Sequence, residues 1–231
     1  MPPGPAEQGE QARERATMVR DQLVTRGISD PLVLQAMTEV PREAFVDPGM
    51  AGRAYHDTPL PIGHGQTISQ PFIVALMAQM AELSPGDRVL EIGAGCGYAA
   101  AVYGRITGQV WAVERLPALA ARARTALDRS GVGKVAVRCG DGSLGWPQEA
   151  PFDAILVAAG SPCMPQSLIR QLADGGRLVA PVGPDAAQQL VRTRRLPDGS
   201  LEEDRHPAVR FVPLIGAEGW PDMSGGADDE G

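Results

Sequence analysis

A glycine-rich segment near the middle of the chain restricts its fold more than any other feature. The apolar run 89–92 is typical of a buried strand, and three glycines at alternate positions follow it, Gly93, Gly95 and Gly97. A helix-like run starts at Tyr98. Glycines at this spacing let the backbone turn sharply and approach a ligand closely, beside the positively polarised amino end of a helix. The segment therefore predicts a strand, a loop and a helix that together hold a nucleotide or nucleoside.

Strands and helices are expected to alternate from residue 88 onward. Apolar runs predict strands at 88–93, 110–114, 134–139, 152–158 and 176–182. Helical patterns lie between most of these strands, at 98–106, 116–130 and 165–173. Alternation of this kind is typical of parallel strands that are covered by helices.

The pattern changes after Gly183. The turn signal at 197–200 lies between strand 189–195 and a later strand, and it predicts an antiparallel hairpin. A final strand is expected at 209–215. The sequence therefore predicts an α/β, Rossmann-like fold with a mostly parallel seven-stranded sheet, an antiparallel C-terminal hairpin and an N-terminal helical elaboration.

The N-terminal third is expected to be helical. Residues 10–27 carry apolar positions at helical spacing. Asp30 followed by Pro31 is typical of a capped helix start, and an amphipathic helix is expected from Phe72 to about Leu83.

Composition divides the chain into one domain with two short tails. Residues 1–9 and 221–231 have a composition typical of disorder, whereas 10–220 are expected to form a single domain. Within it, 10–84 form the helical region and 85–220 form the sheet.

Acidic residues near the predicted loop identify the kind of ligand. Glu114 ends the second strand about 20 residues after Gly93, where a carboxylate typically accepts hydrogen bonds from ribose hydroxyls. Glu91, just before the loop, disfavours a phosphate and favours a cationic group. Asp141 and Gly142 follow the third strand, where an adenine edge would lie, although taken alone they indicate only a turn.

Taken together, these acidic residues suit successive parts of one nucleoside ligand and favour S-adenosylmethionine over a dinucleotide. The dinucleotide fingerprint also places its third glycine one residue later than this loop does. The candidate cofactor-binding residues are Glu91, Gly93, Ala94, Gly95, Glu114, Asp141 and Gly142.

Composition argues against several other classes of protein. A formal net charge of −7 gives no general attraction for nucleic acid. Three widely spaced cysteines favour free thiols in a reducing compartment over disulfides or a zinc site. No apolar stretch approaches the ~20 residues that span a bilayer, and the first residues lack the pattern of a signal peptide. We therefore expect a cytoplasmic monomer without a metal, a nucleic-acid partner or a membrane partner.

Several segments resemble the protein-L-isoaspartate O-methyltransferase family. The resemblance runs from about residue 19 to 214, and the segments that carry it are 40–46, 55–62, 63–71, 88–102, 140–146, 175–179 and 210–214. The glycine loop is shared by many methyltransferases. The sequence Gln-Thr-Ile-Ser-Gln-Pro at 66–71 is far more restricted to this family.

The resemblance implies an enzyme that repairs proteins. Members methylate the α-carboxylate of L-isoaspartyl residues in damaged proteins and peptides, and the ester then cyclises to a succinimide. By resemblance Ser69 is the active-site serine, and Gln66, Thr67 and Ile68 line the cleft for substrate and cofactor, so that 10–84 carry the substrate cleft.

The chemistry of the acceptor agrees with this assignment. A carboxylate is already ionised at neutral pH and needs no general base, so Ser69 would orient an oxygen rather than attack. A serine before Gln70 and Pro71 is also an ordinary helix cap, worth about 1 kcal/mol, and the two roles are compatible.

Other functions stay open at this stage. One is a methyltransferase for tRNA or a small molecule, although neither a basic cleft nor an Asn-Pro-Pro-Tyr motif is evident. Another is an enzyme for aspartate in a peptide natural product. The last is a noncatalytic S-adenosylmethionine-binding module.

Overall fold

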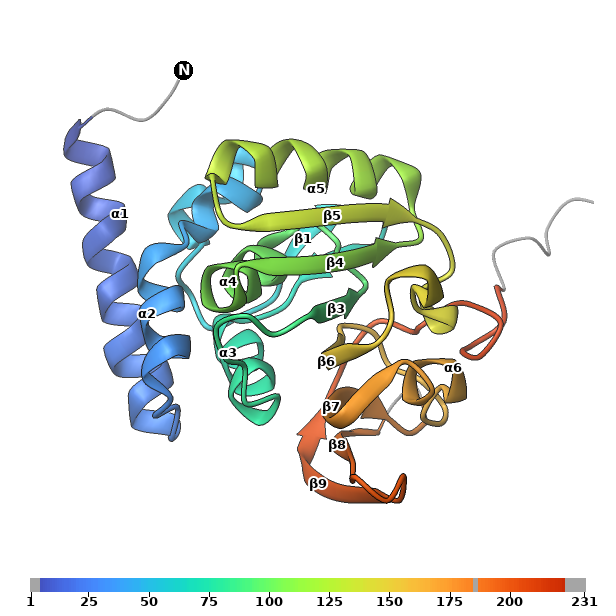
Figure 1. Ribbon diagram of the computed structural model, residues 1–231. Coiled ribbons are helices and arrows are strands. Elements are labelled where there is room, and N and C mark those ends of the chain that lie inside the picture. Colours follow the sequence, from blue (N-terminus) through green and yellow to red (C-terminus); the bar gives the residue numbers. More distant parts are fainter. Residues whose placement is uncertain (1–4, 185–186, 223–231) are drawn as a thin grey trace, which may run out of the picture.

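A seven-stranded sheet forms the centre of the computed structural model, which describes residues 5–184 and 187–222 (Figure 1). The strands run in the order β5-β4-β3-β6-β7-β8-β9. Their bounds are β3 Val89–Ile92, β4 Gln109–Glu114, β5 Lys134–Cys139, β6 Phe152–Val157, β7 Leu172–Val182, β8 Gln188–Arg195 and β9 Leu201–Val209. Neighbours from β5 to β7 are parallel, whereas β8 is antiparallel to both β7 and β9. The predicted fold class is confirmed.

Six α-helices accompany the sheet in the described part of the chain. They are α1 Pro5–Met18, α2 Pro31–Glu39, α3 Pro71–Met80, α4 Tyr98–Thr107, α5 Pro117–Ser130 and α6 Gln166–Ile169. A short π-helix lies at Val19–Leu23. Short 3-10 helices lie at Val24–Arg26, Arg42–Phe45, Pro48–Arg53, Gly142–Leu144 and Pro147–Glu149. A separate antiparallel pair consists of β1 Leu60–Gly63 and β2 Gln66–Ile68.

The strand order creates a crevice at the centre of the sheet. From β3 the chain moves outward through β4 to β5, and it then returns to place β6 on the other side of β3. The connections after β3 and β6 therefore diverge to opposite sides. Ligands of open α/β sheets bind where the connections diverge in this way, outside the carboxyl ends of the strands.

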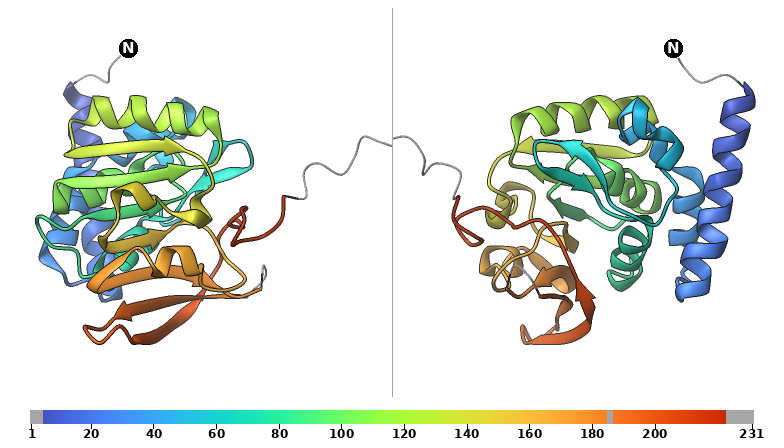
Figure 2. Two further views of the ribbon diagram at one scale, coloured as in Figure 1. Left: turned by 45° about the vertical axis from the view of Figure 1, so that its right-hand side comes forward. Right: turned by 180° about the vertical axis from the view of Figure 1, so that it is seen from behind.

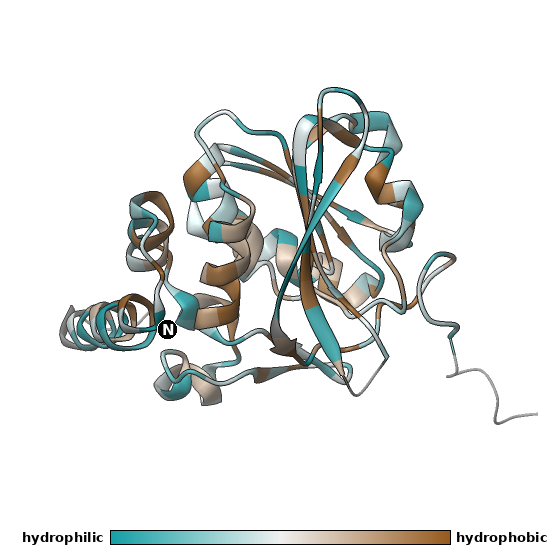
Figure 3. Cartoon of the chain, turned by 90° about the horizontal axis from the view of Figure 1, so that it is seen from below, coloured by the Kyte–Doolittle hydropathy of each residue, from teal (hydrophilic) through white to brown (hydrophobic). Residues whose placement is uncertain are grey.

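Both faces of the sheet are buried in apolar layers. Alternate residues of β3 point to opposite faces: Val89 packs in a cluster with residues of α2 to α5, and Leu90 and Ile92 pack in a second cluster that includes Leu168 of α6. Hydrophobic positions are frequent on the central strands and on the helices beside them (Figure 3). The sheet is thus fixed from both sides, which holds the strand ends in place.

The two N-terminal helices lie far from the carboxyl ends of the parallel strands. α1 and α2 lie side by side near the amino ends of the parallel strands (Figure 1). The Asp30 carboxylate accepts hydrogen bonds from the backbone N–H groups of Leu32 and Val33 at 2.8 and 3.2 Å, which confirms the predicted cap. Residues 5–9, which were expected to be disordered, lie in α1 instead: Ala6, Glu7 and Gln8 favour a helix, and the helix continues through Gly9. Residues 1–4 lie outside the described residues.

Two elements in the C-terminal half differ from those predicted by the sequence. The helix predicted over 165–173 ends at Ile169, because Leu172 already pairs with Phe152 of β6 in the sheet. The further strand predicted over 209–215 does not form: β9, the second strand of the hairpin, ends at Val209. The chain then leaves the sheet edge and passes the carboxyl ends of the strands (Figure 1), where Pro213 bridges to Gly160.

The hairpin of β1 and β2 was not expected from the sequence. It lies below α5 in the view from behind (Figure 2, right), and Arg122 of α5 donates a hydrogen bond to the carbonyl oxygen of Ile62 at 3.0 Å. The segment 66–68 is therefore held next to the strand ends. None of the described helices is both long and apolar enough to cross a membrane.

Candidate active site

Two adjoining pockets open at the carboxyl ends of β3 and β6. We call the first the strand-end pocket: its floor is formed by the ends of β3, β4 and β6, one wall by β2 and another by residues 212–215. We call the second the Ser69 pocket, which lies between β2, the start of α3 and the start of α4. Both are lined by Thr67, Gly93, Gly95 and Ala158. The two pockets are therefore neighbours, and these four residues form the wall that they share.

Glu114 ties the glycine loop to the second strand. Its Oε2 accepts a hydrogen bond from the backbone N–H of Gly95, and its Oε1 accepts one from the N–H of Leu116, both at 2.8 Å. Each carboxylate oxygen keeps a second lone pair. Since Glu114 also lines the strand-end pocket, it can accept two further hydrogen bonds from a diol.

Gly95 brings the loop close to the β1–β2 hairpin. Its φ of +55° lies in the left-handed region, and a Cβ added there would lie 3.1 Å from Cδ1 of Ile62. A side chain at this position would therefore strain the loop and push the end of the Ile62 side chain aside. Together with Gly93 and Ala94, the loop lines the pockets mainly with backbone.

Asp141 joins the turn after β5 to the C-terminal segment. Its Oδ1 accepts hydrogen bonds from the N–H and hydroxyl of Ser143, and its Oδ2 accepts one from the N–H of Ala217, at 2.7–2.8 Å. The side chain thus caps the turn at Gly142–Leu144 and fastens the C-terminal segment. It does not line either pocket, whereas Gly142 lines the strand-end pocket. A Cβ at Gly142 would lie 2.5 Å from Cγ2 of Ile92, so only glycine fits here.

Glu91 is an acidic group enclosed in the core beside the Ser69 pocket. The side chain is 1% exposed, and its Oε2 has no hydrogen-bond partner among the described residues. Burial and the nearby charge of Glu114 raise the pKa of Glu91 well above its usual range. A cationic group of a ligand would offset this buried charge.

This environment predicts that Glu91→Gln stabilises the ligand-free protein. A carboxyl whose pKa is raised in the folded state contributes stability at low pH and loses it as pH rises through the folded pKa. At pH 8 the free energy of unfolding of the variant should exceed that of the wild type by about 1–3 kcal/mol. Each kcal/mol corresponds to about 2–4 °C in Tm for a chain of this size. Near pH 4 the two proteins should be equally stable. The measurement is Tm against pH.

The matched control for this experiment is Glu202→Gln, which removes an equal charge from an exposed position on β9. Its Tm should differ little from the wild type at every pH. A Tm difference for Glu91→Gln that does not change with pH would contradict the assignment of a raised pKa.

Ser69 does not cap α3. α3 begins at Pro71 with Gln70 in the capping position, and the N–H of Phe72 donates to Asp57 instead, at 3.3 Å. The Ser69 hydroxyl has no hydrogen-bond partner in the described part of the chain, although Ser69 lines the pocket. The expected helix cap is therefore wrong, and the hydroxyl is available to a ligand.

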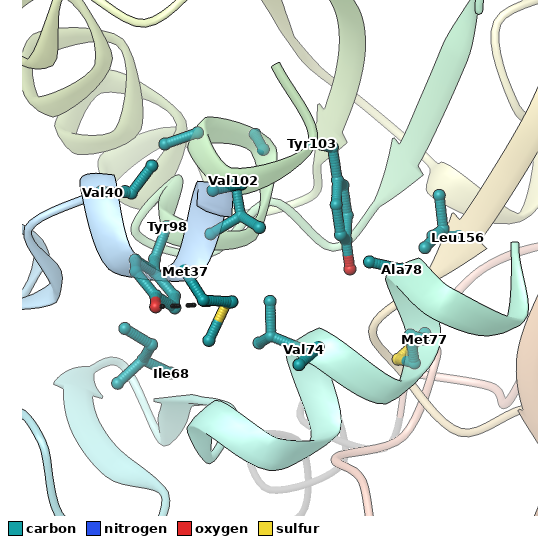
Figure 4. Packing of buried hydrophobic residues seen from close by; sticks show 14 of the residues in the cluster. Met37, Val40, Ile68, Val74, Met77, Ala78, Tyr98, Val102, Tyr103 and Leu156 are labelled. Atoms are coloured by element: carbon teal, nitrogen blue, oxygen red, sulfur yellow. Dashed lines mark hydrogen bonds between the residues drawn. The ribbon is translucent and has the colours of Figure 1, made fainter. Parts of the chain in front are cut away.

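An apolar cluster supports this segment from behind. Ile68 and Val74 lie next to Tyr98, whose hydroxyl donates to Sδ of Met37 at 3.7 Å (Figure 4). The backbone of β2 is thereby held against α4. Of the neighbouring predicted residues, Gln66 and Thr67 line the strand-end pocket, while Thr67, Ile68 and Ser69 line the other.

The sequence did not assign two parts of the site. Ala158 and Ala159 follow β6 and line the strand-end pocket, and residues 212–215 form its wall. The alanines could have been found from their position at the end of a central strand. The family resemblance includes 210–214, but no local pattern places 212–215 at the site, because the path of the chain after β9 is set by distant contacts. No group of three or more potential metal ligands lies together in residues 5–184 and 187–222.

Comparisons with known proteins agree with this geometry. Residues 13–219 match the family described as protein-L-isoaspartate(D-aspartate) O-methyltransferase. Protein-L-isoaspartate O-methyltransferase 1 of Rhodopseudomonas palustris (strain HaA2) is 58% identical over 214 residues, which cover 92% of this chain and 87% of the relative.

Solved structures show the same likeness. A protein-L-isoaspartate O-methyltransferase superposes with a TM-score of 0.80 at 32% identity, over 89% of this chain and 67% of that one. A Plasmodium falciparum β-aspartate methyltransferase in complex with S-adenosyl-L-homocysteine superposes with a TM-score of 0.75 at 26% identity, over 87% and 98% of the two chains.

Proposed function

Because the chain belongs to the protein-L-isoaspartate(D-aspartate) O-methyltransferase family, we propose that its two pockets bring S-adenosylmethionine and an isoaspartyl carboxylate together. The chain is an S-adenosylmethionine-dependent methyltransferase for L-isoaspartyl residues, which arise when Asn deamidates or Asp isomerises. The methyl ester of the α-carboxylate cyclises to a succinimide, and hydrolysis then returns some normal aspartate. The enzyme thus serves protein repair.

The strand-end pocket suits the nucleoside part of the cofactor. Glu114 would accept from both ribose hydroxyls, and the turn at Gly142 would lie along the adenine. Glu91 would offset the ammonium charge of the methionyl group, which agrees with its buried, unpartnered oxygen. Gly93, Ala94 and Gly95 leave the space that a close approach of the ligand requires. When bound, S-adenosylmethionine supplies a methyl group that is activated by the positive sulfur.

The Ser69 pocket suits the acceptor. A carboxylic acid has a pKa of about 4, so at neutral pH the acceptor is already the nucleophile and no residue has to remove a proton. The chain's task is to align the carboxylate oxygen with the methyl group and to exclude water. Ser69 would donate its hydroxyl to one carboxylate oxygen, while Thr67 and Ile68 confine the group.

The observation that carries this proposal is the shared wall of the two pockets. Thr67, Gly93, Gly95 and Ala158 line both, so the two pockets would hold donor and acceptor in adjoining spaces. We further propose a single domain over residues 10–220 that acts as a cytoplasmic monomer. Its three free cysteines and formal net charge of −7 are consistent with a reducing compartment and with protein rather than nucleic-acid substrates.

The proposal predicts strict selectivity among matched peptides. Peptides with L-isoaspartyl, L-aspartyl or D-aspartyl at one position would be incubated with labelled S-adenosylmethionine, and base-labile label would be counted. We expect label on the isoaspartyl peptide and little on the L-aspartyl peptide. Equal labelling of these two peptides would refute the proposal. In a parallel reaction with tRNA as the acceptor, label on tRNA alone would indicate a different acceptor.

A further inference from the structure

Arg42 is one of the largest fully buried side chains in residues 5–184 and 187–222, and it lies directly behind the Ser69 pocket. It is 0% exposed, in the turn Arg42–Phe45. Its guanidinium donates to three carbonyl oxygens, those of Ala54 at 2.7 Å, Ser69 at 2.8 Å and Thr58 at 3.5 Å. The side chain therefore connects Ser69 to the loop that precedes the β1–β2 hairpin.

The charge of Arg42 has no carboxylate partner. In the described part of the chain no acidic group forms an ion pair with Arg42. Asp57, whose charge acts to raise the pKa of Arg42, is itself paired with Arg26. Burial lowers the pKa of Arg42, but a guanidinium stays charged at neutral pH. An unpaired charge in the interior costs free energy unless something offsets it. The three carbonyl dipoles offset part of that cost.

The pocket is flanked by this cation and by an acidic side chain. The guanidinium carbon is 5.1 Å from the centre of the Tyr98 ring, and Tyr98 and Ser69 both line the pocket. Glu91 lines the same pocket with its buried carboxylate. The pocket thus has a fixed positive charge behind Ser69 and, at Glu91, an acidic group whose ionised form a nearby cation would favour, which matches the charges of an acceptor carboxylate and a sulfonium donor.

We infer that Arg42 is a positioning residue that holds Ser69 through its carbonyl and makes the pocket selective for an ionised acceptor. This inference rests on the proposed function. Arg42 acts without touching the substrate: its hydrogen bond fixes the backbone that carries the serine hydroxyl, and its charge favours a carboxylate over a neutral group of the same shape.

The experiment compares Arg42→Met and Arg42→Lys with the wild type. The ligands are an isoaspartyl peptide and the same peptide with the α-carboxylate replaced by a carboxamide, which serves as a competitive inhibitor. In the wild type the amide should bind more weakly than the substrate. Arg42→Met should reduce that preference about tenfold, whereas Arg42→Lys should retain most of it. Both should lower kcat, because neither can hold the three carbonyls as a guanidinium does.

Two controls separate this role from folding and from net charge. Affinity for S-adenosylhomocysteine should stay near the wild-type value in both variants, since Arg42 does not line the strand-end pocket. Arg53→Met removes a charge from a neighbouring exposed turn and should change neither kcat nor the carboxylate preference.

The outcomes distinguish the two proposals. A wild type that does not methylate the isoaspartyl peptide refutes the proposed function. A wild type that does, with an unchanged carboxylate preference in Arg42→Met, refutes the role of Arg42. If Arg42→Met does not fold, the lysine variant decides: wild-type kcat, or a lost carboxylate preference, would overturn the inference.

Discussion

Glu114→Ala is expected to bind S-adenosylhomocysteine at least about 100-fold more weakly than the wild type. The variant loses the carboxylate that would accept from two ribose hydroxyls, and hydrogen bonds to a charged group are worth about 1.5–3 kcal/mol each. It also leaves the N–H groups of Gly95 and Leu116 without their acceptors. The glycine loop then loses its fixed position as well. Titration calorimetry measures the affinity directly.

The matched variants are Glu114→Gln and Asp128→Ala. Glutamine keeps the shape but offers one acceptor oxygen, so its affinity should lie between those of the wild type and the alanine variant. Asp128 is exposed on α5, and its replacement should leave the affinity unchanged. Wild-type affinity in a folded Glu114→Ala protein would refute the ribose assignment, and Tm values of all variants confirm that they are folded.

Local sequence predicted those parts of the candidate site that lie at the carboxyl ends of neighbouring parallel strands. Gly93, Gly95 and Glu114 belong to consecutive units of a parallel sheet, whose geometry brings strand ends to one edge. Their arrangement follows from the order of the elements alone. The same reasoning placed β3 to β6 close to their observed bounds.

Distant contacts decided the features that local sequence could not predict. Asp141 receives the N–H of Ala217, which lies 76 residues further along the chain, because the segment after β9 crosses the strand ends. The carbonyl of Ser69 is held by Arg42, 27 residues earlier. The sequence around 69–71 offered an ordinary helix cap, yet packing places Gln70 at the cap and leaves the serine hydroxyl free. In each case a residue type suited two roles, and tertiary packing selected one.

Ser69→Ala is expected to lower kcat by about 10- to 100-fold, with little change in affinity for S-adenosylhomocysteine. Removal of the hydroxyl leaves the acceptor carboxylate ionised but less well aligned, since one charge-assisted hydrogen bond is lost. The nucleoside part of the cofactor site stays intact because Ser69 does not line the strand-end pocket, and the Glu91 side chain is unchanged. Stability should change little, since the hydroxyl has no partner in residues 5–184 or 187–222.

The informative comparison for this variant is with Ser69→Thr and with a change of pH. Threonine keeps a hydroxyl at the same position and should restore much of the lost rate. The rate of the alanine variant should stay low across pH 6–9, because the missing group orients the acceptor and does not exchange a proton with it. Steady-state methylation of the isoaspartyl peptide gives both quantities. Full activity of Ser69→Ala would show that the backbone of 66–69 and the field of Arg42 suffice to align the carboxylate, and Ser69 would then have no catalytic part.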